Sequence, residues 1–284
     1  MKVISTVRQL QVSIKKSGLS PTGLVPTMGA LHRGHLSLVE NALSTCPVTV
    51  VSIFVNPTQF NDKKDLQHYP RTIDADLKML GSVLRNEDIV FTPEVLEMYP
   101  EKDTRTFSFG NLDRVMEAKH RPGHFNGVAQ IVSKLFNAVN PEFAFFGIKD
   151  FQQLAVIKNL VKQMGSNINI VSCPIVREPD GLAMSSRNML LGKEVRENAP
   201  VIFRTISTAA SMLDVNDIPA IKDFVTGSIN KVPDFSVEYY EVADDVELIP
   251  AQTKHEMIPG RKYYGCIAVK AGKIRLIDNI EMNK

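Results

Sequence analysis

The chain has 284 residues, enough for one domain of about 150 to 200 residues and a smaller companion. Hydrophobic residues make up 44% of it and charged residues 23%, values typical of a globular protein and not of a disordered or membrane-embedded one. Thirty-three basic and 31 acidic residues give a formal net charge of +2 without a long run of like charge. Nucleic-acid and membrane partners are therefore not expected, and small molecules are.

The three cysteines, Cys46, Cys173 and Cys266, show neither C-x-x-C spacing nor a disulfide framework, so we expect buried, reduced thiols. The N-terminal segment lacks the apolar core of a signal peptide, and no stretch reaches the roughly 18 apolar residues of a membrane span. These features predict a cytoplasmic location.

Short apolar runs alternate with segments of helical periodicity through the first two thirds of the chain. The expected strands are 23–27, 48–55, 88–91, 143–146 and 168–176, and the expected helices are 36–43, 73–84, 128–139 and 154–164. Alternation of this kind predicts an α/β fold with a parallel sheet covered by helices on both faces. Ligands of such sheets bind at the carboxyl ends of the strands.

The pattern changes after residue 188. Helices are expected at 194–213 and 218–229, followed by strands at 235–242, 265–270 and 273–277. Ala271-Gly272 is a plausible turn between two antiparallel strands. We therefore predict two domains, residues 1–188 and a smaller α+β domain of residues 189–284.

The first candidate site is segment 26–35, which contains the H-x-G-H motif, follows the first expected strand and begins the first strong helix. Free backbone N–H groups and the positive end of the helix favour anions at such a position. His32 and His35 then lie on one face. Two other interpretations remain open: that the histidines merely begin the helix, or that they bind a metal, although no Glu follows in the zinc-protease pattern.

Four further segments carry polar residues next to expected strands. Segment 177–188 holds hydroxyls and guanidinium groups suited to a triphosphate, although a polar turn with a helix N-cap explains it equally well. In segment 146–153, Lys149 offers a charge to phosphate, and Asp150 is expected mainly to cap a helix. Segments 55–60 and 120–128 are interpreted respectively as an ordinary turn with useful amides, and as a lid or anion contact.

Six motifs occur together and in order: MGALHRGH at 28–35, FVNPTQF at 54–60, YPR at 69–71, HRPGHFNGV at 120–128, FFGIKDFQQ at 145–153 and IVREPDGLAMSSRN at 175–188. In these motifs the chain resembles the pantothenate synthetase family over nearly its whole length. The resemblance implies that residues 1–188 are a Rossmann-like domain binding ATP and pantoate, that residues 189–284 are a lid domain, and that the protein is a homodimer.

The implied activity is a Mg²⁺-dependent ligation of (R)-pantoate to β-alanine. Pantoate attacks the α-phosphorus of ATP to give pantoyl adenylate and pyrophosphate, and β-alanine then displaces AMP to give pantothenate, as in coenzyme A biosynthesis.

The resemblance also implies roles for individual residues. The catalytic residues are His35, as proton donor, with His32, Lys149 and Arg187 at the phosphates. The ATP contacts are Met28, Gly29, Ala30, Leu31, His32, Arg33, Gly34, His35, Gly147, Ile148, Lys149, Asp150, Val176, Met184, Ser185, Ser186 and Arg187. The substrate contacts are Gln59, Gln153 and Asn56, and Asp76 is the candidate ligand for Mg²⁺.

Three positions depart from the commonest family pattern: Arg33 replaces Asp, Ile148 replaces Glu and Asn126 replaces Asp. Two other functions are consistent with H-x-G-H. One is a nucleotidyltransferase that moves AMP or CMP onto a phosphate. The other is a nucleotide-binding regulator that has lost catalysis.

Overall fold

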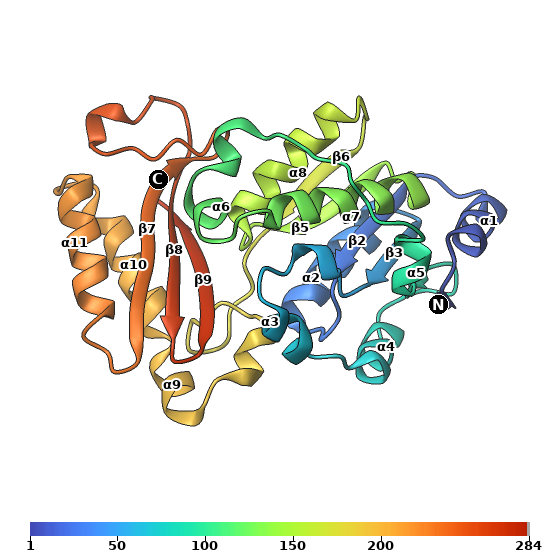
Figure 1. Ribbon diagram of the computed structural model, residues 1–284, viewed down its shortest axis with the longest axis horizontal. Helices are drawn as coiled ribbons and strands as arrows, with labels where there is room; N and C mark the ends of the chain where they lie inside the picture. Colours follow the sequence, from blue (N-terminus) through green and yellow to red (C-terminus); the bar gives the residue numbers. More distant parts are fainter. Residues whose placement is uncertain (283–284) are drawn as a thin grey trace. The chain divides into compact units, whose positions relative to one another are not determined.

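A computed structural model describes residues 1–282 (Figure 1). The contacts within the chain divide it into two compact units. The first contains Met1–Phe109, His120–Ile148 and Val156–Pro174, and the second contains Gly110–Lys119, Lys149–Ala155 and the chain from Ile175 onward. These units are not the contiguous segments 1–188 and 189–284, because short internal segments group with the carboxyl-terminal part. The two expected domains stay a prediction about functional organisation.

The first unit is built on a six-stranded sheet in the order β1-β4-β3-β2-β5-β6, with every neighbouring pair parallel. The strands are β1 Lys2–Ile4, β2 Thr22–Thr27, β3 Val48–Ile53, β4 Ile89–Phe91, β5 Phe143–Gly147 and β6 Asn169–Cys173. Since the strands are parallel, their carboxyl ends lie at one edge of the sheet. The segments that follow β2, β3 and β5 therefore leave from the same edge.

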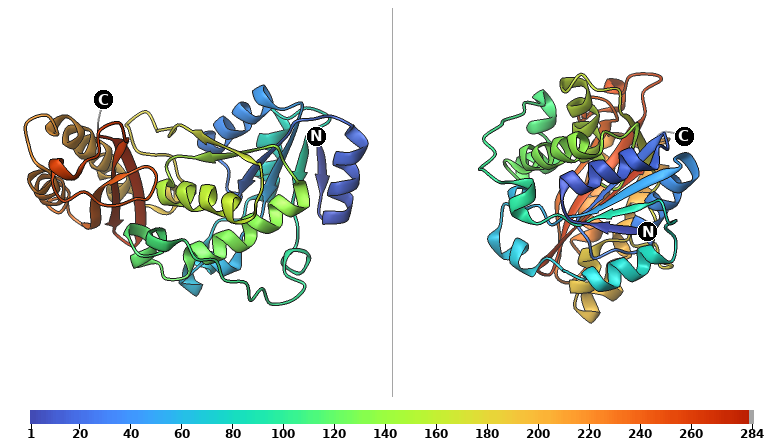
Figure 2. Two further views of the ribbon diagram at one scale, coloured as in Figure 1. Left: turned by 90° about the horizontal axis from the view of Figure 1, so that it is seen from above. Right: turned by 90° about the vertical axis from the view of Figure 1, so that its right-hand side faces the viewer.

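Helices flank both faces of this sheet (Figure 2). The α-helices of this unit are α1 Val7–Ser17, α2 Arg33–Thr45, α3 Lys63–His68, α4 Ile73–Gly81, α5 Val95–Met98, α7 His124–Val139 and α8 Phe151–Gln163, whose first turn groups with the second unit. Leu38 and Val39 of α2 and Leu80 of α4 form one core with strand residues such as Val25 and Val51. Burial of these side chains stabilises each by about 1.5–3 kcal/mol relative to exposure.

The second unit contains an antiparallel sheet in the order β7-β8-β9, covered by two helices. Its elements are η2 Gly110–Asp113, α6 Met116–His120, η3 Ser186–Leu190, α9 Lys193–Asn198, α10 Val201–Met212, α11 Ile218–Ile229, β7 Phe235–Asp244, η4 Lys254–Glu256, β8 Tyr263–Ala271 and β9 Ile274–Glu281. Ile206, Ile221 and Ile267 belong to its core. The predicted α/β fold with a smaller α+β part is thus confirmed. Up to residue 282, no helix has both the length and the apolar character needed to cross a bilayer.

Several boundaries differ from the predicted ones for local reasons. The helix expected at 194–213 is interrupted at Pro200, whose ring and missing N–H end α9 and permit α10 to begin. β6 ends at Cys173, just before Pro174, for the same kind of reason. The hairpin loop is Gly272-Lys273 because Ala271 still pairs with Ile274. β1 and α1 were not predicted from the short N-terminal pattern.

The cysteines provide a test of the folded core. All three are buried and outside disulfides, and burial raises the pKa of both Cys46 and Cys173 to about 11 and that of Cys266 still further. Near pH 8 they remain protonated, so a thiol reagent that consumes thiolate should react far more slowly with the folded protein than with protein in guanidinium, which should titrate 3 thiols. Rapid reaction of one thiol in the folded protein would contradict this arrangement.

Candidate active site

The H-x-G-H loop leaves β2 with an unusual backbone conformation. Gly29 and Ala30 have φ angles of 79° and 48°, in the left-handed region that favours glycine. Ala30 has no such freedom, so its conformation requires support from the surrounding structure. That support comes from a carboxylate in α4.

Asp76 lies in the first turn of α4 and is only 2% exposed. Its two carboxylate oxygens accept hydrogen bonds from the backbone N–H groups of Ala30, at 2.9 Å, and Leu31, at 2.8 Å. Thr72 donates a further hydrogen bond to Oδ1 at 3.1 Å. Asp76 therefore holds the loop in place. This geometry lends no support to its predicted role as a ligand of Mg²⁺, which stays a prediction.

His32 and His35 form a reciprocal cap at the start of α2. The Nδ1 atom of His32 accepts from the N–H of Gly34 at 3.1 Å, and Nδ1 of His35 accepts from the N–H of His32 at 3.3 Å. The two rings lie with their centroids 4.1 Å apart. The interpretation of the two histidines as helix-start residues is therefore confirmed, and this cap has a chemical consequence. With Nδ1 accepting, a neutral imidazole carries its proton on Nε2.

The backbone N–H groups of this loop are used differently from the expected way. The N–H groups of Ala30, Leu31, His32 and Gly34 already donate to side chains, and that of Gly29 donates to Oγ1 of Thr27 at 3.2 Å. The expected row of free backbone donors is thus absent from this segment. What the loop can offer phosphate is the pair of imidazole Nε2–H groups and the positive end of α2.

Gln59 stands close to this loop in the first unit. It ends the short helix η1 Pro57–Gln59, which follows β3, and its Nε2 donates to the sulfur of Met28 at 3.0 Å. The ring of the buried His124 donates through Nδ1 to the Gln59 carbonyl oxygen at 2.8 Å. Asn56 donates to the Gln59 side-chain oxygen at 3.1 Å. The structure thus brings together the predicted contacts Met28, Gln59 and Asn56.

Helix α7 approaches η1 so closely that only glycine is accommodated at position 127. A Cβ atom on Gly127 would clash with the carbonyl oxygen of Thr58. One residue earlier, Asn126 accepts from the N–H of Phe107 at 2.9 Å and donates to the carbonyl of Arg105 at 3.3 Å. An aspartate at this position would keep the first bond and lose the second. Segment 120–128 therefore has a structural role that its sequence did not reveal.

In the second unit, the segment 176–184 forms a tight turn tied to β9. Met184 donates to the carbonyl of Val176 at 3.0 Å. Arg177 makes a bidentate ion pair with the buried Asp278, at 2.6 and 3.0 Å, and its guanidinium lies 3.7 Å from the centroid of the Phe203 ring. The guanidinium of Arg177 is therefore already paired with a carboxylate of the protein itself.

The segment that continues from this turn begins a 3₁₀ helix. The Ser185 hydroxyl accepts from the N–H of Arg187 at 3.2 Å, which makes Ser185 the N-cap of η3. Ser186 is buried at 7% exposure. The interpretation of this segment as an N-cap is therefore confirmed, and its role at a triphosphate stays a prediction.

Lys149 and Asp150 stand before α8, also in the second unit. The Lys149 ammonium lies 3.9 Å from a carboxylate oxygen of Asp150, and its carbonyl accepts from the side chain of Asn279 at 3.0 Å. The Gln152 amide is buried and hydrogen-bonded to backbone atoms of residues 112, 115 and 117. Its neighbour Gln153 is half-buried.

The remaining predicted ATP contacts lie in the first unit. Gly147 ends β5, and a Cβ atom there would meet nothing within 4 Å, which leaves room for a ligand. Ile148 donates its N–H to Cys173 at 2.9 Å. The Arg33 guanidinium pairs with Glu40 of the same helix at 2.6 Å, so part of its charge is balanced within α2.

A parallel sheet with an H-x-G-H loop at the carboxyl end of one central strand defines a Rossmann-like nucleotide-binding protein. The family model described as "Pantoate-beta-alanine ligase" matches residues 1–281. A pantothenate synthetase from Bacteroides fragilis is 51% identical over 283 residues, covering 99% of each chain.

Solved structures agree with this match. A pantothenate synthetase from Thermus thermophilus superposes with a TM-score of 0.90 at 38% identity, covering 100% of both chains. A Francisella tularensis pantoate-beta-alanine ligase, in complex with β,γ-ATP and β-alanine, gives 0.82 at 32% identity, covering 100% of this chain and 98% of that one. The chain belongs to the pantoate–β-alanine ligase family. It is an ATP-dependent ligase of pantothenate synthesis.

The role of Asp76 can be tested by substitution. Asp76→Ala leaves the N–H groups of Ala30 and Leu31 buried without acceptors, so we expect the free energy of unfolding to fall by about 2 to 4 kcal/mol. ATP affinity, measured by calorimetry, should fall as well because the loop loses its conformation. Asp74→Ala, at an exposed carboxylate of the same helical turn, is the matched control and should change stability by less than about 0.5 kcal/mol. Unchanged unfolding by urea in Asp76→Ala would exclude this role.

Proposed function

We propose that the enzyme joins pantoate to β-alanine in two steps, through a pantoyl adenylate, with His32 and His35 acting at the phosphates. The observation that supports this proposal most directly is the reciprocal cap of the two imidazoles, in which each Nδ1 accepts a hydrogen bond from a backbone N–H. Each Nε2–H is then a donor aimed by a rigid helix start, which suits it to phosphate oxygens of ATP.

The two steps follow from the chemistry of the substrates. A carboxylate oxygen of pantoate attacks the α-phosphorus, and the bond from that phosphorus to the pyrophosphate oxygen breaks. The uncharged amine of β-alanine then attacks the acyl carbon, loses a proton and expels AMP. Amide formation from a free carboxylate is unfavourable because hydroxide is a poor leaving group, whereas AMP is a good one.

The residue roles in this proposal follow the family motifs. His35 donates a proton, His32 stabilises the phosphate charge, and Lys149 and Arg187 contact phosphates, as an ammonium and a guanidinium are suited to do. Gln59 and Gln153 hold pantoate, and Gln59 also lies near β-alanine. Support for Gln59 comes from its contact with Met28 of the H-x-G-H loop.

Magnesium enters this proposal with the nucleotide. Among residues 1–282, no group of three or more His, Cys, Asp or Glu side chains is placed to hold a metal ion. Both oxygens of Asp76 serve the loop backbone. When bound, Mg²⁺ would neutralise charge on the ATP phosphates, which would be its main ligands. Homodimer formation and a lid role for residues 189–284 are further proposals that rest on the family resemblance, and a cytoplasmic location stays a prediction from the sequence.

Product analysis tests the two-step ligase. The protein is incubated with ATP, D-pantoate, β-alanine and Mg²⁺, and AMP and pantothenate are quantified, with each substrate omitted in turn. We expect AMP and pantothenate in equal amounts from the full mixture, and transfer of ¹⁸O from labelled pantoate carboxylate to AMP. A dinucleotide or a diphosphate conjugate would instead indicate the nucleotidyltransferase alternative, and the absence of turnover would favour the regulator.

The role of Arg187 can be separated from a structural one. If its guanidinium stabilises departing pyrophosphate, Arg187→Ala should slow adenylate formation by roughly 10²- to 10³-fold. Consumption of preformed pantoyl adenylate with β-alanine should be nearly unchanged. Arg204→Ala, at an exposed guanidinium on α10 of the same unit, serves as the control. Equal losses in both half-reactions would refute the assignment.

A further inference from the structure

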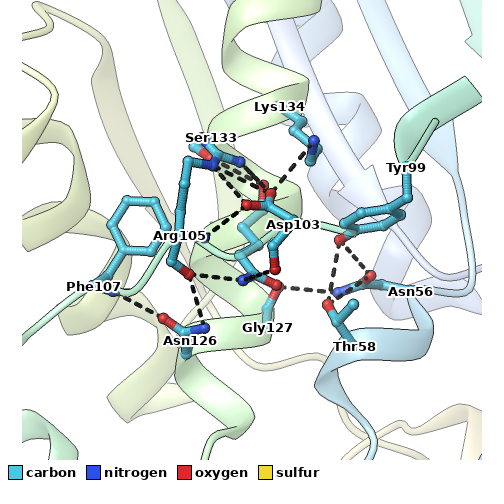
Figure 3. A network of polar contacts seen from close by, with 11 residues as sticks. Asn56, Thr58, Tyr99, Asp103, Arg105, Phe107, Asn126, Gly127, Ser133 and Lys134 are labelled. Atoms are coloured by element: carbon cyan, nitrogen blue, oxygen red, sulfur yellow. Dashed lines mark hydrogen bonds and ion pairs between the residues drawn. The ribbon is translucent and has the colours of Figure 1, made fainter. Parts of the chain in front are cut away.

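Asn56 is buried among polar groups at the start of η1. It is 1% exposed, and both ends of its amide are hydrogen-bonded (Figure 3). Its Nδ2 donates to the carbonyl oxygen of Gly127 at 3.0 Å and to Oε1 of Gln59 at 3.1 Å. Its Oδ1 accepts from the hydroxyls of Tyr99, at 2.8 Å, and Thr58, at 3.1 Å.

These bonds give the amide of Asn56 a single direction. The carbonyl oxygen of Gly127 can only accept, so the atom of Asn56 that faces it must be the NH₂ group. Because Nδ2 is a donor, the atom of Gln59 on its other side must be the acceptor Oε1. The backbone of α7 thus determines, through Asn56, which end of the Gln59 amide is which. The NH₂ end of Gln59 then points to the sulfur of Met28.

Tyr99 closes the opposite end of this relay. It follows α5, and its hydroxyl lies within hydrogen-bond distance of both Asn56 and Thr58 (Figure 3). Its ring is held independently of the hydroxyl, by Phe54 at a centroid distance of 6.3 Å and by the Lys134 ammonium 5.0 Å from its centroid. The hydroxyl of Tyr99 can therefore be removed while its ring stays packed.

We infer that Tyr99 is a positioning residue of the pantoate site: together with the carbonyl of Gly127 it fixes the Asn56 amide, which in turn keeps the NH₂ end of Gln59 directed at the substrate. This inference rests on the proposed contact between Gln59 and pantoate. Pantoate is rich in oxygen, with a carboxylate and two hydroxyls, so a donor attracts it and a carbonyl oxygen repels its carboxylate. A reversed Gln59 amide would present the wrong group.

The contact between Gln59 and Met28 fits this role. A thioether is a weak hydrogen-bond acceptor, so the Gln59 N–H loses little when it turns to a substrate oxygen. While the N–H turns, the bonds to Asn56 and to His124 hold the side-chain oxygen and the backbone carbonyl of Gln59. The side chain is thus fixed at its acceptor end and exchangeable at its donor end.

Steady-state kinetics of Tyr99→Phe test the inference. Loss of one neutral hydrogen bond should raise KM for pantoate about three- to tenfold, with much smaller changes in KM for ATP. The matched control is Tyr240→Phe, which removes a buried hydroxyl in the second unit whose partner is the sulfur of Met282 at 3.4 Å. It should leave all three KM values unchanged.

A double substitution shows whether Tyr99 acts through Gln59. In a Gln59→Ala background, Tyr99→Phe should have little further effect on KM for pantoate, because the group that it orients is gone. Equal effects in both backgrounds would overturn the inference. So would an equal rise in KM for ATP, since general disorder of the fold affects every substrate.

A spectroscopic measurement separates this inference from the proposed substrate contact. In protein labelled with ¹⁵N-glutamine, the two side-chain N–H resonances of Gln59, assigned by their loss in Gln59→Ala, should be well dispersed in the wild type and move toward free-amide positions in Tyr99→Phe. Unchanged resonances would overturn the positioning role. If they move as expected but Gln59→Ala leaves KM for pantoate unchanged, the orientation stands, and the assignment of Gln59 to pantoate fails together with the substrate part of the inference.

Discussion

The organisation of the first unit depends on the hydrogen bonds between the Asp76 carboxylate and the backbone after β2. The loop turns sharply through Gly29 and Ala30, and only a buried acceptor can satisfy the N–H groups that this turn directs inward. α4 supplies that acceptor. The start of α2, and with it the position of both histidines, follows from how this short segment is held.

Hydrogen bonds between the backbone and side chains run in two directions around the candidate site. At the H-x-G-H loop, side chains accept from the backbone and so establish its shape. Near Gln59 the direction is reversed, and the backbone carbonyl of Gly127 determines the polarity of a chain of side chains. In both cases a main-chain group determines the orientation of the side chain, because a backbone N–H can only donate and a backbone carbonyl can only accept.

The sequence was sufficient to predict the main architecture and the segments that carry polar residues. Strand and helix periodicity predicted β2, β3, β5 and α11 closely, since each is regular and bounded by turn residues. It could not predict that Asp76 would bind the backbone of Ala30 and Leu31, because these residues lie 46 and 45 positions earlier in the chain and only the folded sheet brings them close. Similarly, no local pattern links Asn56 to Gly127, which is 71 residues away. The motifs themselves were informative, but the partners that orient their side chains were visible only in three dimensions.

The relay from Gly127 to Gln59 contains only uncharged groups. Burial raises the pKa of Tyr99 above that of an ordinary phenol, so this hydroxyl keeps its proton throughout the neutral range. No group between Gly127 and the Gln59 amide therefore gains or loses a proton in the pH range where imidazole groups ordinarily titrate. The proposal thus assigns recognition of an oxygen-rich ligand to an uncharged relay, and proton transfer to the histidines of the H-x-G-H loop, which are chemically different groups.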